Sequence, residues 1–311
     1  MKNFFICAIC ATISGIFVTG CSDNDYSEPI GSQWIDPVFA RVLEKKHYIS
    51  DASTVTPSEI AHLTDVDVSY ASYITSLKGI EYFTALEILK CSRNDIGQIN
   101  LSCNTKLREL RCDGNPLKIL DISNNVQIER LYCYDCQLTQ LDVSKNVQLI
   151  ELSCDRNELT QLDVSKNTQL TELSCSGNPL KHLDISNNTH LTRLWCLSNE
   201  LTHLDVSNNT QLIDLYCFNN SLTHIDVSNN TQLVVFYCRN NQLTQLDVSK
   251  NAQLTYLACS DNLLKQLDVS NNTQLIGLYC YNNQLTQLDV SNNTQLTELY
   301  CYNNQLTQLD V

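Results

Sequence analysis

The sequence has little basic charge and no long hydrophobic run. Its 20 lysines and arginines are outnumbered by 34 aspartates and glutamates, which gives a formal net charge of −14. Nucleic acids and anionic lipid surfaces bind basic surfaces, so this balance argues against both as partners. The longest apolar stretch, residues 4–18, is too short to cross a bilayer comfortably.

Candidate catalytic groups are also scarce. No acid–base pair or nucleophile arrangement emerges from the sequence, and no set of ligands converges on a metal. We therefore expect a protein that is not an enzyme and that holds no cofactor or metal. The few histidines are scattered along the chain: His47, His62, His182, His190, His203 and His224.

The first residues have the features of a secretory signal peptide. Lys2 precedes the apolar run, and small residues lead to Cys21 in "VTGC". This ending resembles the lipobox of bacterial lipoproteins, which implies cleavage after residue 20 and a lipid on Cys21. An ordinary signal peptide with an incidental cysteine is the alternative. The "SDND" that follows looks like the export signals of surface-exposed lipoproteins in Bacteroidetes, which implies outer-membrane attachment and display on the cell surface.

The rest of the chain is dominated by an exact spacing. The pattern L-x-x-L-x-C-x-x-N-x-L-x-x-L-D-V-S-x-N-x-x recurs every 21 residues, eleven times from Leu86 to the incomplete last copy at Val311. A short fixed period predicts a solenoid, in which each turn buries its apolar face against the next. The spacing is that of a leucine-rich repeat. Positions 4 and 6 should point inward from a short parallel strand, with positions 3, 5 and 7 pointing outward. No helix fits in 21 residues, so the outer side should be extended or turn-like.

The residues before the repeats predict a cap. Residues 34–62 should be helical, because Asp36 and Pro37 suit a helix start and "TPSE" at 56–59 suits a capping box. Residues 63–85 read as an irregular first repeat, and residues 21–33 as a tether. The predicted domains are thus a signal peptide (1–20), this tether, the helical cap, the irregular repeat and the repeats at 86–311.

Three polar features of the repeat have structural interpretations. The asparagine at position 9 should turn inward and bond backbone groups at the bend, with Cys136 as a weaker replacement in one turn. The "NNT" strings match glycosylation acceptors but are better read as turn residues. The aspartate of "LDVS" forms an exposed ladder that neighbouring serines and amides could stabilise, with calcium binding as the alternative.

Eleven cysteines occupy position 6, and Cys103 and Cys136 stand apart. In-register neighbours should hold their Cβ atoms about 4.8 Å apart, beyond the roughly 3.5–4.5 Å of a disulfide. We expect reduced, buried and inert packing residues, with disulfide or metal roles as the alternatives. The ladder consists of Cys91, Cys112, Cys133, Cys154, Cys175, Cys196, Cys217, Cys238, Cys259, Cys280 and Cys301.

The outward positions vary, and we expect ligand binding there. Early turns carry mixed charge and later turns carry aromatic residues, which offer large rigid contact area with a polar handle. Stacking between strands for stability alone is the alternative. The predicted ligand-binding residues are Tyr132, Tyr134, Trp195, Tyr216, Phe218, Tyr237, Tyr256, Tyr279, Tyr281, Tyr300 and Tyr302.

These repeats resemble the internalin class of bacterial leucine-rich repeats, especially the internalin J-like group with its cysteine ladder. The resemblance covers residues 86–311, and residues 63–85 look like an internalin-type first repeat. It implies a curved, surface-anchored adhesion module that binds host proteins or glycoproteins on its concave face. Two departures are the lipid anchor, which suggests a Gram-negative organism, and the lack of an immunoglobulin-like or mucin-binding module after the repeats.

The sequence thus predicts a non-catalytic binding or adhesion protein with a protein or glycoprotein ligand. The alternative is a glycan-binding lipoprotein for nutrient capture, because stacked aromatic rings suit sugars. The membrane contact is expected through the N-terminal lipid only. The last repeat stops at Val311 without a polar cap. We expect either further residues or a covering partner there, such as a second copy of the chain.

Overall fold

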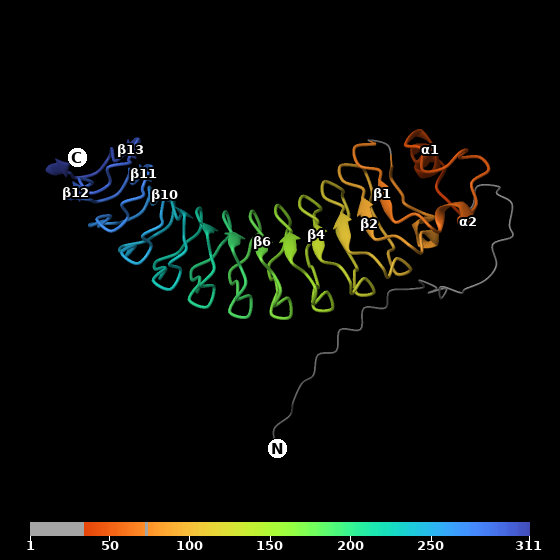
Figure 1. Cartoon of the computed structure of the whole chain (residues 1–311), viewed down its shortest axis with the longest axis horizontal. Helices are drawn as coiled ribbons and strands as arrows, with labels where there is room; N and C mark the ends of the chain where they lie inside the picture. Colours follow the sequence, from red (N-terminus) through yellow and green to blue (C-terminus); the bar gives the residue numbers. More distant parts are fainter. Residues whose placement is uncertain (1–33, 72–73) are drawn as a thin grey trace, which may run out of the picture.

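The computed structural model describes residues 34–71 and 74–311. The predicted signal peptide, the lipidated Cys21 and the tether at 21–33 lie outside these residues. The described residues stack into one curved solenoid, with α1 at one end and β14 at the other (Figure 1). None of its helices is long and apolar enough to span a membrane.

A parallel sheet of twelve strands runs the length of the solenoid. Each strand is three residues long, and from β2 onward its residues pair with those 21 positions later, so the repeat period is also the strand register. The leucine-rich repeat fold is therefore confirmed. The strands are β1 Asp65–Asp67, β2 Ile88–Lys90, β3 Glu109–Arg111, β4 Arg130–Tyr132, β5 Glu151–Ser153, β6 Glu172–Ser174, β7 Arg193–Trp195, β8 Asp214–Tyr216, β9 Val235–Tyr237, β10 Tyr256–Ala258, β11 Gly277–Tyr279 and β13 Glu298–Tyr300.

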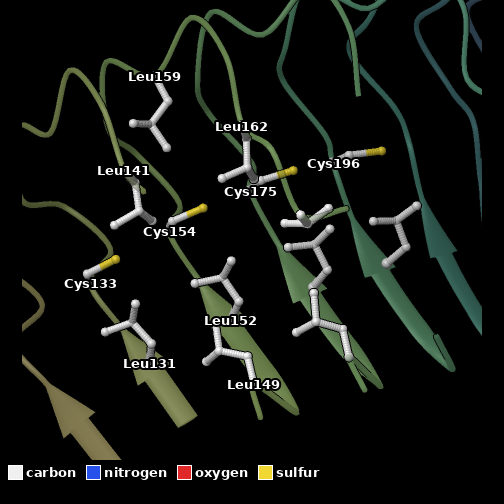
Figure 2. Close-up of a cluster of buried hydrophobic side chains, with 14 of the residues drawn as sticks. Leu131, Cys133, Leu141, Leu149, Leu152, Cys154, Leu159, Leu162, Cys175 and Cys196 are labelled. Atoms are coloured by element: carbon white, nitrogen blue, oxygen red, sulfur yellow. The ribbon is translucent and has the colours of Figure 1, made fainter. Parts of the chain in front are cut away.

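The interior is a stack of leucine and cysteine rungs. The central residue of each strand points inward, as Leu131 and Leu152 do, and the cysteine two positions later lies beside it (Figure 2). Ten of the eleven ladder cysteines, Cys91 to Cys280, have no exposed surface, and Cys301 is half-buried. All eleven are free thiols, so the prediction of reduced packing cysteines is confirmed in this structure. Each buried leucine contributes on the order of 2 kcal/mol through the hydrophobic effect.

The position-9 asparagines hold the bend after each strand. In Asn178, Nδ2 donates to the carbonyl oxygens of Cys154 (3.1 Å) and Cys175 (3.0 Å), and Oδ1 accepts from the amide of Leu159 (3.1 Å). One side chain thus joins two turns, as predicted. Cys136 reproduces part of this, because its thiol lies 3.3 Å from the Cys112 carbonyl oxygen and its amide bonds Asn157. Whether that turn is weaker stays a prediction.

A second asparagine ladder was not foreseen as a packing device. It occupies position 19, the second asparagine of each "NNT" string, and is almost completely buried. Asn230 shows the pattern: its Nδ2 donates to the carbonyl oxygens of Val206 and Asn209, both at 2.9 Å. The ladder comprises Asn104, Asn125, Asn146, Asn167, Asn188, Asn209, Asn230, Asn251, Asn272 and Asn293.

The outer side is turn-like, as expected, and becomes regular only where β12 (Gln287–Asp289) pairs with β14 (Gln308–Asp310). Along the outer side, each ladder aspartate from Asp121 to Asp289 accepts a hydrogen bond from the serine amide two residues later, for example Ser144 to Asp142 at 2.9 Å. This is an Asx turn, which is repeated along the stack.

The helical cap covers the first turns. Helix α1 (Pro37–Lys45) begins as predicted, because Oδ1 of Asp36 accepts from the amides of Val38 and Phe39. Helix α2 (Pro57–Ile60) follows, and η1 (Ile80–Tyr82) is a single 3₁₀ turn before β2. The predicted capping box at α2 is wrong.

At that helix the Thr56 side chain makes no cap hydrogen bond to the backbone. The Glu59 carboxylate instead accepts from the amide and hydroxyl of Ser50, both at 3.1 Å. The glutamate therefore ties α2 to the loop after α1 rather than to its own first turn.

Candidate functional site

Positions 3, 5 and 7 of every turn form one continuous surface, which we call the strand face. In the turn of β8 these are Asp214, Tyr216 and Phe218, all half-buried, while Leu215 between them is fully buried. The alternation follows from strand geometry, in which successive side chains point to opposite sides. All eleven predicted ligand-binding residues lie on this face, but the structure divides them into three groups.

The first group is Tyr132 and Tyr134, at the end nearest the cap. The guanidinium carbon of Arg111 lies 4.4 Å from the centre of the Tyr132 ring, and the Tyr132 hydroxyl donates to Glu151. Burial, together with a hydrogen bond to Asp113, raises the pKa of Tyr134. Both phenols are therefore neutral at physiological pH and fixed by charged neighbours.

The second group is Trp195, Tyr216 and Tyr237 on β7, β8 and β9, with Phe218 beside them. Trp195 stacks on Tyr216 with ring centres 6.1 Å apart, and Tyr216 meets Tyr237 edge to face at 5.1 Å. The guanidinium of Arg239 lies 4.6 Å from the Phe218 ring centre. These contacts order the side chains into one rigid row across three strands.

The third group contains two columns of stacked tyrosines. Tyr279 stacks on Tyr300 at 5.2 Å, and Tyr281 stacks on Tyr302 at 4.7 Å, with ring planes within 9° of parallel in both pairs. A Cβ atom added to Gly277 would lie 2.7 Å from Cδ1 of Tyr256. The Tyr256 ring therefore lies over this glycine and joins the group.

Small residues separate the three groups. Ser153 and Ser174 stand between Tyr132 and Trp195 in the position-5 column, and Ala258 stands between Tyr237 and Tyr279. The serines form a polar floor, where Oγ of Ser174 donates to Asp155 at 2.5 Å. The aromatic residues are thus three ordered groups and not one unbroken strip.

Ion pairs occupy position 3 along the same face. Arg193 bridges Glu172 (2.5 Å) and Asp214 (3.2 Å), and Arg130 Nε lies 3.3 Å from Glu151. Each pair joins neighbouring turns. Because the arginines are about half exposed, these pairs order the surface more than they stabilise the fold.

A hollow of about 350 Å³ lies where the helical cap meets the strand face. We call it the cap hollow. The helical cap contributes Lys46, which directly follows α1, and the irregular first repeat contributes the end of β1 and the residues after it. The regular repeats contribute the ends of β2, β3 and β4. Its lining residues are Lys46, Asp67, Ser69, Tyr70, Lys90, Ser92, Arg111, Asp113, Tyr132 and Tyr134.

Sequence reasoning missed the cap's share of this hollow. Lys46 precedes the repeats and Tyr70 lies in the irregular first repeat, so the 21-residue period relates neither of them to Lys90 or Arg111. Sequence reasoning also missed the backbone conformation at position 8, although the residue types there indicate it. Position 8 has positive φ in every turn, as in Arg156 at 51° and Gly177 at 65°. Asparagine, aspartate and glycine are frequent at that position and favour this conformation.

The ten fully buried cysteines of the ladder, Cys91 to Cys280, have no reactive chemistry. Burial raises the pKa of Cys217 to about 12, and the pKa of each neighbouring rung is also raised by burial. Thiolate is the nucleophilic and metal-binding form, so these thiols are inert in the folded protein. Among residues 34–71 and 74–311, no cluster of histidine, cysteine and carboxylate side chains could hold a metal ion. Calcium along the aspartate ladder stays a prediction, which unfolding with calcium or a chelator would test.

The histidines do not form a site either. His182, His203 and His224 are exposed on the outer side, at position 13 of three successive repeats, and His190 lies at a turn. None of these positions belongs to the strand face, which consists of positions 3, 5 and 7. The geometry on the strand face is that of a recognition surface, with ordered rings, ion pairs and one polar hollow.

Comparisons with known proteins agree with this geometry. The functional domain of InlJ from Listeria monocytogenes, described as including a cysteine ladder, is 38% identical, with 88% of this chain and 71% of that chain covered and a TM-score of 0.69. The internalin InlF from the same organism is 25% identical over 90% of this chain and 92% of its own, with a TM-score of 0.76.

A more distant structure shares the fold alone. The plant peptide hormone receptor RGFR1 in complex with RGF2 is 20% identical, covers 83% of this chain and 48% of its own, and has a TM-score of 0.70. No model of a known protein family matches the chain, and no curated protein sequence matches it.

Proposed function

We propose, from the premise that this chain belongs to the internalin family of leucine-rich repeat proteins, that it is a non-catalytic, surface-anchored binding or adhesion protein. Its ligand is a protein or glycoprotein of a host or neighbouring cell, held on the strand face. The internalin fold supports a binding scaffold, and the ligand itself is part of the proposal.

The observation that carries this proposal is the order of the aromatic groups. Stacking between strands stabilises the sheet, which is the alternative role of these residues. Stacking also fixes the orientation of the rings before a ligand binds. Pre-ordered tyrosine and tryptophan side chains lose little conformational entropy on binding. In addition, rings stacked nearly parallel cover each other's faces and present hydroxyls and edges. A protein surface can pack against such edges.

A pull-down with extracellular proteins tests this role. Purified chain would be compared with the Tyr279→Ala/Tyr281→Ala/Tyr300→Ala variant, and we expect the variant to lose most of the captured ligand. Val147→Ala is the matched control, because Val147 is 50% exposed but lies in the loop before β5. Equal capture by all three proteins, each with an unchanged far-ultraviolet circular dichroism spectrum, would overturn the proposal.

Anchoring is a separate part of the proposal. A lipid on Cys21 would hold the solenoid at the outer membrane of a Gram-negative bacterium, on the cell surface. Metabolic labelling with a fatty-acid analogue should mark the protein but not a Cys21→Ala variant, and protease treatment of intact cells should degrade it. Protection from protease would place it on the inner side of that membrane.

Self-association through the last turn is a further part. Leu309 and Val311 are 44% and 86% exposed, and β14 has a neighbour on one side within the described residues. An apolar strand edge of this kind can pair with another chain. Light scattering coupled to gel filtration should detect a dimer, and a monomer at high concentration would contradict this part.

Glycan capture is the second candidate, and the polar cap hollow favours it. A glycan array probed with the chain should then give saturable signals, while the pull-down would recover only proteins that carry those glycans. Removing the glycans from a captured protein separates the two candidates, because binding to the polypeptide survives that treatment.

A further inference from the structure

We infer that the cap hollow binds a sugar that carries a carboxylate, such as a uronic or sialic acid. The inference rests on the proposed binding function and names a ligand class for one end of the strand face. Three properties of the hollow support it: cations with spare donors, carboxylates with spare acceptors, and tyrosines at its wall.

The cations come from two separate parts of the fold. Lys90, at the end of β2, forms no ion pair within the described part of the chain, although its charge helps to lower the pKa of Asp67. Lys46 reaches Asp67 only at 3.8 Å. An ammonium group has three donors, so both lysines can still bind a carboxylate. The whole chain has a net charge of −14, whereas this hollow has two lysines whose hydrogen-bond donors are not all used.

The acceptors are two carboxylates: Asp67 at the end of β1, and Asp113 just after β3, with β2 between these two strands. Asp113 is 4% exposed and accepts from the Ser92 hydroxyl at 2.6 Å, while Asp67 accepts from the Ser69 amide at 2.9 Å. Burial acts to raise the pKa of Asp67, but the Ser69 hydrogen bonds and the two lysines outweigh it and lower the pKa. Asp113 also accepts from the Tyr134 hydroxyl. A carboxylate has about four lone-pair sites, so each group keeps some of them for ligand hydroxyls.

Tyrosines form part of the wall. Tyr70 is 69% exposed, and the Arg93 guanidinium lies 6.0 Å from its ring centre. Tyr132 at the end of β4 and Tyr134 just after that strand also line the hollow. Aromatic rings suit the apolar face of a sugar ring, and their hydroxyls suit its edge. A volume of about 350 Å³ is within the range of small-ligand sites.

A sugar fits this combination better than an acidic peptide does. A peptide segment with several carboxylates would meet Asp67 and Asp113, which repel them, and would need a groove longer than this hollow. A sugar acid brings one negative charge for the lysines and several hydroxyls for the aspartates. The mixture of donors, acceptors and rings therefore matches a polyhydroxylated ligand with a single charge.

Isothermal titration calorimetry on the full chain tests the inference with defined probes. The acidic probes are 3′-sialyllactose and galacturonic acid, which each carry one carboxylate and distinguish sialic from uronic acids. Lactose and the methyl ester of galacturonic acid are their neutral counterparts, and pentaglutamate is the acidic peptide. We expect at least one acidic sugar to bind and its neutral counterpart to bind at least about ten-fold more weakly, as loss of a charged hydrogen bond predicts.

Two variants locate the site. Lys90→Gln removes one charge from the hollow and should weaken binding about ten-fold. Lys181→Gln is the matched control, because Lys181 is an exposed lysine on the outer side, far along the stack from the hollow, and this variant should bind as the parent does. Thermal unfolding of both variants checks that each remains folded.

Four outcomes would overturn the inference: neither acidic sugar binds, acid and neutral counterpart bind equally, only pentaglutamate binds, or Lys90→Gln binds as the parent does. None of these outcomes affects the proposed function, which depends on protein capture and on the tyrosines of the third group. Loss of capture by the triple tyrosine variant together with no binding of acidic sugars would retain the function and reject only the ligand class.

Discussion

Leu215 and Tyr216 are neighbours in β8, yet they belong to columns that behave in opposite ways. The column of Leu215 is leucine in ten of eleven turns, with Phe236 as the exception, while the column of Tyr216 contains lysine, arginine, serine, alanine, tryptophan and tyrosine. The first column is buried between turns, except that Leu299 in the last turn is half-buried, and the second column lies on the strand face.

The difference between interior and strand face shows what each position must satisfy. An interior residue fills a fixed volume and sits between two identical neighbours, so a change is felt by three turns at once. A strand-face side chain points away from the interior, so its volume is not fixed by the turns on either side. The face can therefore hold ion pairs in one part, serines in another and stacked rings in a third without any change in the backbone.

The largest expected contrast is in thiol reactivity. Burial raises the pKa of Cys217 to about 12, while Cys301 is half-buried in the last turn. Iodoacetamide at pH 8 should label Cys301 at least about a hundred-fold faster than Cys217 in the folded protein, because thiolate is the reactive form. Mass spectrometry of native and unfolded protein measures this. Equal native labelling would mean that the stack opens readily.

Adjacent asparagines provide the sharpest stability contrast. Asn230→Leu leaves the buried carbonyls of Val206 and Asn209 without their donor and should lower the free energy of unfolding by about 2–4 kcal/mol. Asn229→Leu removes only an exposed hydrogen bond to Ser207 and should cost less than about 1 kcal/mol. Urea unfolding of both variants gives the comparison. Similar losses would show that the interior ladder is not a special constraint.

A double-mutant cycle on Tyr281 and Tyr302 measures stacking on the strand face. Their rings lie 4.7 Å apart and 4° from parallel, so the coupling between Tyr281→Ala and Tyr302→Ala should be about 0.5–1.5 kcal/mol. Tyr256 and Tyr302 are not in ring contact and serve as the control cycle, with coupling near zero. A coupling near zero in both cycles would remove stacking as a source of order in the third group.

The smallest expected effect belongs to the exposed aspartate ladder. Hydrogen bonds from the side chain and amide of Ser144 lower the pKa of Asp142, and Asp163 and Asp184 have equivalent serines. A depressed carboxyl pKa gives stability above the unfolded pKa, which is lost as pH falls through the folded one. The melting temperature should therefore fall between pH 5 and pH 2.5.

Asparagine at these three positions keeps the Asx turn and removes the titration. The triple variant Asp142→Asn/Asp163→Asn/Asp184→Asn should lose less melting temperature over the same pH interval than the parent does. An identical fall in both proteins would assign the acid sensitivity to other carboxylates. Calcium added at pH 7 to the parent alone tests the alternative role of the same ladder.

Much of the fold was predictable because a 21-residue period can be satisfied in few ways. The inward leucine and cysteine, the position-9 asparagine and the N-cap at Asp36 each follow from local geometry. The sequence did not predict the partner of a side chain where two environments were available to it. Glu59 bonds Ser50 rather than its own helix, and the position-19 asparagines pack inside although "NNT" reads as a surface turn.

The candidate site was predictable by residue and in its broad grouping, but not in its ring contacts. All eleven aromatic residues lie on the strand face because side-chain alternation is fixed by the strand, and Ser153, Ser174 and Ala258 divide them in the position-5 column. The contacts within each group depend on how rings lean toward neighbouring turns, as Tyr256 leans over Gly277. Such leaning is decided by packing between turns, which the repeat pattern does not encode.

The sequence by itself determined the solenoid, its register and which positions face outward, since each is a consequence of spacing along one chain. Tertiary structure alone decided where Lys46 and Tyr70 lie relative to Lys90 and Asp113. Lys46 comes from the helical cap, which has no periodicity, and Tyr70 from the irregular first repeat, whose strand is 23 and not 21 residues from its partner. Only the packing of these two parts against the first regular turns brings their side chains around one hollow.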